Sequence, residues 1–133
     1  MDLTVNILIG IIIAATPLVY AAIGELVVEK SGVLNLGVEG MMISGAIAAF
    51  AVTIETGSVV AGVAAAIICG ALLALIFAFL TQTLLANQVA TGLALTMFGL
   101  GLAALLGQAY SGKSAPEFPK LDIPGITDLP IVG

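Results

Sequence analysis

Long apolar stretches separated by short polar ones dominate the pattern of this chain. A helix needs about 20 apolar residues to cross the ~30 Å hydrocarbon core of a bilayer, and four stretches approach or reach that length. The expected spans lie at about residues 3–23, 33–54, 59–80 and 89–109. The pattern therefore predicts an all-α fold, a polytopic transmembrane helix bundle of about four spans that occupies residues 1–109.

Polar residues set the boundaries of these spans. Residues 40–54 are too short to cross a bilayer alone, and the extension back to residue 33 brings Asn35 and Glu39 into the second span. No charged residue occurs in residues 56–112, so this stretch has room for two helices, and its polar residues 81–88 divide them. Residues 24–32 are polar enough to lie at the membrane interface as a hinge, and Glu25 and Glu29, four positions apart, would repel each other on a helix.

The chain changes character after Tyr110. Four of its five prolines fall in the last 18 residues, and five charged residues lie between residues 113 and 128. Prolines at this density prevent a helix and favour an extended, water-exposed segment. We therefore expect residues 110–133 to form a proline-rich extramembrane loop, and the chain to be truncated within it.

Composition supports a membrane protein and excludes several other classes. The 133 residues are 61% hydrophobic and only 8% charged, with a mean hydropathy of +1.28, whereas roughly a quarter of the residues of a soluble domain are charged. The net charge of −5 argues against nucleic acid as a partner, since such binding needs a basic surface. With no His and one Cys, we expect no metal site, no cofactor and a lipid bilayer as the environment.

Small residues recur every four positions along three of the expected helices, a spacing that lets membrane helices approach closely. Chance spacing in alanine-rich helices remains an alternative for any single stripe. Six residues on these stripes are the predicted helix-packing positions: Gly40, Ser44, Gly62, Gly70, Gly99 and Gly107.

The most polar part of the apolar sequence surrounds Asn35 and Glu39, with glycines at positions 32, 37 and 40. An ionisable group at membrane depth costs at least about 2.5 kcal/mol, and glycines permit a broken helix. Two interpretations stand side by side. Asn35 and Glu39 line a substrate pathway, or Glu39 caps a helix end at the membrane interface.

Asn87 and Gln88 form a second polar pair, for which a place near the pathway competes with a solvated loop between helices. We expect no residue of the chain to carry out covalent chemistry, and therefore no catalytic residues. A match to a phosphate-binding loop at residues 107–114 lacks the strand and the helix that such a loop requires.

The sequence EKSGVLNLGVEGMM at residues 29–42 resembles a signature near the N-terminus of permease subunits of bacterial ABC importers for nucleosides and simple sugars. That group is more distantly related to ribose and branched-chain amino acid permeases. The sequence NQVATGLAL at residues 87–95 resembles a later segment of the same family. Lys30 stands where the family often has Arg.

The resemblance implies that the chain is the N-terminal portion of a permease in a bacterial inner membrane. It also implies three partners, namely a second permease subunit, cytoplasmic ATPase subunits that hydrolyse ATP, and an extracytoplasmic substrate-binding protein. Residues 24–32 and 81–88 would then face the cytoplasm, although the lysine count weakly favours the opposite orientation.

A second hypothesis belongs to another class. Four helices with small-residue stripes could also form a complete, small membrane protein that oligomerises as a scaffold or pore. The proline-rich end of the chain favours the permease fragment over this alternative. Neither composition nor spacing distinguishes a nucleoside from a sugar as the substrate.

Overall fold

The computed structural model describes residues 3–116, so most of the predicted proline-rich loop lies outside the described residues. Within that range the chain forms helices and no strands, which confirms the predicted all-α fold. Four helical segments are long and apolar enough to cross a membrane. The elements are α1 (Leu3–Lys30), α2 (Val38–Thr56), α3 (Val59–Ala78), the π-helical η1 (Phe79–Thr83), α4 (Gln88–Gly107) and the 3-10 helix η2 (Gln108–Tyr110).

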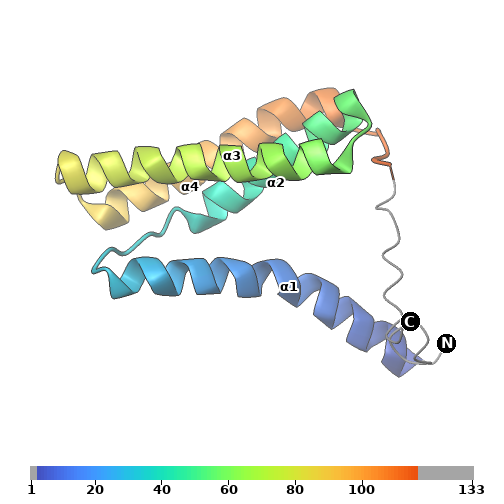
Figure 1. The fold of residues 1–133 in the computed structure, drawn as a ribbon, viewed down its shortest axis with the longest axis horizontal. Coiled ribbons are helices and arrows are strands. Elements are labelled where there is room, and N and C mark those ends of the chain that lie inside the picture. The colour runs from blue at the N-terminus through green and yellow to red at the C-terminus, as the bar shows by residue number, and fades with distance from the viewer. Residues whose placement is uncertain (1–2, 117–133) are drawn as a thin grey trace.

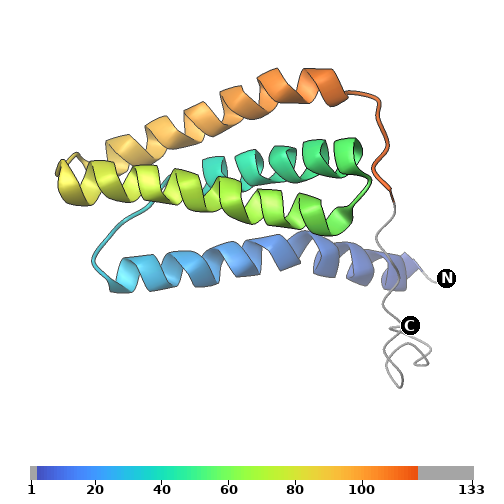
Figure 2. The ribbon, with the colours of Figure 1, turned by 45° about the horizontal axis from the view of Figure 1, so that its top comes forward.

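Helices α2, α3 and α4 pack together, and α1 runs beside them (Figures 1 and 2). The buried apolar core is small and consists of Leu73, Phe77 and Leu95. No residue of α1 is buried, and long apolar side chains are exposed on α1, α3 and α4. Such exteriors suit hydrocarbon rather than water.

Helix α1 continues through Lys30, where the sequence suggested a hinge after residue 23. Glu25 and Glu29, four residues apart in α1, repel each other by only a few tenths of a kcal/mol. This repulsion is too weak to end a helix. The helix ends where Gly32 adopts a φ of +84°, a left-handed conformation that glycine adopts without strain. Pro17 lies within α1, which bends along its length (Figure 1).

The remaining boundaries follow from local capping. Gly57 ends α2 with a φ of 68° and donates its N–H to the Thr53 carbonyl, and the Ser58 hydroxyl accepts from the Ala61 N–H at 3.3 Å to begin α3. Asn87 begins α4 in the same way, since its Oδ1 accepts from the Ala90 N–H at 3.0 Å. Helix α2 begins at Val38, five residues later than expected. The Asn35 side chain accepts from the Gly37 N–H and forms a turn just before the helix.

Candidate functional site

The segment between α1 and α2, residues 31–37, is a non-helical connector whose backbone is bound by side chains from distant helices. The Leu34 N–H donates to Gln88 Oε1 of α4 at 2.8 Å. The Asn35 N–H donates to Glu25 Oε1 of α1 at 3.0 Å. These bonds satisfy donors that a broken helix would otherwise leave unpaired.

A third side chain binds the connector from α4. The Thr96 hydroxyl donates to the Leu36 carbonyl at 2.9 Å, although 60 positions separate the two residues in the sequence. Side chains from α1 and α4 thus converge on a few consecutive backbone groups. The connector is therefore fixed relative to both helices.

Asn35 is the polar centre of the connector and is buried, with 7% of its surface exposed. Its Oδ1 accepts from the Gly37 N–H at 2.9 Å, an Asx-type turn that precedes α2. Its Nδ2 faces Met41 Sδ at 3.8 Å, a long and weak contact. The amide therefore shapes the entry into α2 and keeps most of its donor capacity free.

Glycines allow α4 to lie directly against the connector and the start of α2. A Cβ atom on Gly40 would stand 2.5 Å from the Leu95 carbonyl oxygen, and one on Gly92 would stand 2.8 Å from the Leu36 nitrogen. Gly99 lies equally close to the backbone of Gly40. These positions admit no larger side chain unless the backbones move apart.

The other predicted packing residues differ in their surroundings. Gly62 lies against Thr53 and the Ala49 carbonyl, at the contact of α2 with α3. Ser44 is wholly buried, and its Oγ has no hydrogen-bond partner among the described residues. Gly107 makes only loose contact, with Ile47 Cδ1 at 3.8 Å from a built Cβ atom, and nothing lies within 4 Å of one on Gly70.

Glu39 stands apart from the connector contacts. It is exposed in the first turn of α2 and accepts no hydrogen bond within residues 3–116. A carboxylate at a helix N-terminus is favoured by the helix dipole. The exposed Ala46 follows seven residues later, which places it on the same side of α2.

The two polar pairs predicted from the sequence are thus divided in space. The structure brings Asn35 and Gln88 together at the connector, leaves Glu39 on an exposed side of α2, and uses Asn87 as a helix cap.

Sequence reasoning missed three residues of this site, namely Glu25, Gly92 and Thr96. Only the last two left a signal, because Gly92, Thr96 and Gly99 share one side of a helix by their spacing of four and three.

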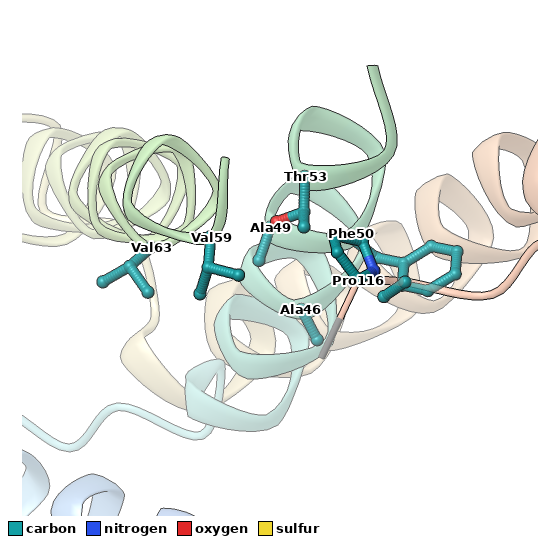
Figure 3. Close-up of a pocket in the computed structure, with 8 residues that line it drawn as sticks. Ala46, Ala49, Phe50, Thr53, Val59, Val63 and Pro116 are labelled. Carbon is teal, nitrogen blue, oxygen red and sulfur yellow. The ribbon is translucent and has the colours of Figure 1, made fainter. Parts of the chain in front are cut away.

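A small apolar pocket of about 200 Å³ lies along the C-terminal half of α2, away from the connector (Figure 3). Phe50 lines it and meets the Tyr110 ring edge to face, with centroids 6.3 Å apart. Lys113 Nζ lies 4.8 Å from the centroid of the same Tyr110 ring. The pocket offers almost no polar groups, so it serves packing better than ligand binding. No group of three or more metal-binding side chains gathers in residues 3–116.

Comparison with known proteins places these features in a family. Residues 7–125 match the family model described as branched-chain amino acid transport system / permease component. The whole chain aligns with the putative glucose ABC transporter permease protein TsgC13 of Haloferax volcanii, with 42% identity over 137 residues and 42% of that protein covered.

Two further relatives give the same picture. The guanosine ABC transporter permease protein NupQ of Bacillus subtilis is 34% identical over 92% of this chain and 42% of its own length. The nucleoside ABC transporter permease protein NupC of Lactococcus lactis is 25% identical over 96% of this chain and 43% of its own length. The chain thus matches the N-terminal portion of proteins more than twice as long. No solved structure matches it.

Proposed function

Because the chain belongs to the branched-chain amino acid transport system / permease component family, we propose that it is the N-terminal portion of the permease subunit of an ATP-driven importer for nucleosides or simple sugars. Permease subunits carry the translocation path and leave ATP hydrolysis to separate subunits. The permease named for glucose and those named for guanosine and nucleosides support both substrate classes.

The connector is the observation that carries this proposal. Non-helical backbone at membrane depth persists only where protein or a water-filled cavity surrounds it, and transporters place such broken helices beside their substrate paths. The connector, residues 31–37, interrupts the helical path between α1 and α2, and Glu25, Gln88 and Thr96 bind its backbone groups.

We assign different roles to the four polar residues. Asn35 and Gln88 hold the connector as part of a gate, and Glu39 presents a carboxylate to the pathway from the exposed side of α2. Asn87 caps the start of α4 and thereby positions its neighbour Gln88, which binds the connector.

The partners follow from the same proposal. The subunit pairs with a second permease subunit in a bacterial inner membrane, binds cytoplasmic ATPase subunits and receives substrate from an extracytoplasmic binding protein. The alternative of a small, complete scaffold or pore is not favoured, since the relatives are permeases along the whole matched length.

The test is uptake of labelled glucose and labelled nucleosides by vesicles that contain the complete permease, its ATPase and its binding protein. We expect accumulation that needs ATP. Glu39→Gln should lower the uptake rate about tenfold, equivalent to about 1.4 kcal/mol. The matched variant Glu29→Gln, which changes another exposed glutamate, should leave the rate unchanged. Solute leakage without ATP or ATPase would refute the importer and support the pore.

A further inference from the structure

Two hollows follow one another between α1 and α3. The first, of about 600 Å³, lies between the C-terminal end of α1, the connector and the second half of α3. The second, of about 1010 Å³, lies between the middle of α1, the first half of α2 and the middle of α3. We call them together the slot. Figure 2 shows α1 beside α3 with their axes apart.

The wall that α3 gives to the slot is made largely of small residues. Ala66, Gly70, Ala74 and Ala78 line it at a regular spacing of four. Gly62 begins the same stripe and is in tight contact with α2, whereas Gly70 has nothing within 4 Å of a built Cβ atom. The start of the stripe therefore packs against α2, whereas at Gly70 the stripe packs against no other helix within residues 3–116.

Fixed contacts keep α1 in its position along the slot. The Glu25 carboxylate of α1 accepts from the connector, and Gln88 and Thr96 bind the connector to α4. No residue of α1 is buried. Folded proteins pack their interiors at nearly crystalline density, so a space of this size is filled by lipid, water or protein. Its mostly apolar lining disfavours water and leaves lipid or protein.

The polar end of the slot decides between these occupants. Ser31, Asn35 and Gln82 line the first hollow. The Ser31 hydroxyl donates to the Val28 carbonyl, but the side-chain nitrogens of Asn35 and Gln82 make only long contacts, at 3.8 and 3.5 Å. An acyl chain would leave these amide groups without a better partner. A helix can bring a polar side chain to that end. Its backbone can also approach the glycine and alanine wall closely, which is the usual basis of helix association in membranes.

We infer that the slot is the seat of a further transmembrane helix of the same permease. This helix presents apolar side chains to Met42 and Ile67 and a hydrogen-bonding side chain to Asn35 and Gln82. The relatives contain enough additional sequence to supply this helix, because the chain covers only 42% of the length of two of them. The inference rests on the proposed function.

Photo-crosslinking identifies the occupant directly. Met42 lines the slot, and photo-methionine replaces it with little change of shape. The complete permease is labelled in native membranes, irradiated and mapped by mass spectrometry, with Met42→Leu as the matched control. We expect Met42 to join a peptide of the same polypeptide that lies beyond the region matched here.

A lipid or water adduct at Met42, or a link to a second copy of the chain, would overturn the inference. These results can occur in a permease that still transports, so they are distinct from a failure of the proposed function.

A second measurement tests the polar end. Gln82→Leu should lower the apparent unfolding temperature of the complete permease but not that of the 133-residue chain. Gln108→Leu, an exposed glutamine at the other end of the bundle, should change neither. Equal effects of Gln82→Leu on both proteins would contradict a polar contact from the seated helix.

Discussion

The contact of α2 with α4 and the slot between α1 and α3 are both lined by small residues, yet they differ in packing. Gly40 and Gly99 bring two backbones into direct contact, whereas Gly70 faces open space. Hydrogen bonds from Gln88 and Thr96 accompany the first contact, whereas within residues 3–116 no side-chain hydrogen bond joins α1 to α3 across the slot. A stripe of small residues thus marks a surface for close approach without naming the partner.

The largest expected effect comes from filling the tight contact. Gly40→Leu would force a side chain against the Leu95 carbonyl, which lies 2.5 Å from a built Cβ atom. Overpacking of this kind costs about 3 kcal/mol, so we expect the variant to lose its folded form in detergent. Thermal unfolding with size-exclusion chromatography measures this loss.

Gly101→Leu is the matched control, since nothing lies within 4 Å of its built Cβ atom. Gly70→Leu sharpens the comparison. It should be tolerated in the 133-residue chain and damage the complete permease. Tolerance of Gly40→Leu would show that the α2–α4 contact is not tight.

The second effect concerns the bond between α1 and the connector. Glu25→Ala removes the acceptor of the Asn35 N–H, and hydrogen bonds to charged groups contribute about 1.5–3 kcal/mol. We expect a loss of about 2 kcal/mol in the free energy of unfolding, measured by denaturant titration. Glu29→Ala, which removes the other glutamate of the same helix end, should change it by less than about 0.5 kcal/mol. Equal losses for the two variants would mean that Glu25 affects stability only through its negative charge near the end of α1, and not through its bond to Asn35.

These two regions also show what the sequence could predict. Apolar length was enough to predict four helices, because crossing a bilayer leaves few other solutions for the backbone. The connector could not be derived in the same way. Leu34 and Gln88 are 54 positions apart, and no local pattern pairs them. Glu25 was interpreted only through its repulsion from Glu29, which is weak compared with the bond that it makes to Asn35.

A smaller loss is expected at the α4 side of the connector. Thr96→Val keeps the shape of the side chain and removes the donor to the Leu36 carbonyl. A neutral hydrogen bond contributes about 1 kcal/mol, so the free energy of unfolding should fall by that amount. Thr83→Val is the control, since Thr83 is exposed and its side chain makes no hydrogen bond among the described residues. If both variants behave alike, the Thr96 bond does not hold the connector.

The smallest change in the free energy of unfolding is expected for Ser44→Ala, and this variant should be as stable as the original chain or more stable. Ser44 Oγ is wholly buried in α2 without a hydrogen-bond partner among the described residues. A buried hydroxyl without a partner is costly, and its removal can be neutral or stabilising. Ser44→Ala keeps a small residue on the stripe of α2, so close packing is preserved and the free energy of unfolding should stay constant or rise by up to about 1 kcal/mol.

Ser58→Ala provides the contrast, since the Ser58 hydroxyl caps α3 and loss of such a cap costs about 1 kcal/mol. Denaturant titration of both variants in the 133-residue chain measures the difference. A loss at Ser44 as large as that at Ser58 would mean that the hydroxyl bonds to the carbonyl one turn before it. The α2 stripe would then stabilise the helix through a polar bond as well as through its small size.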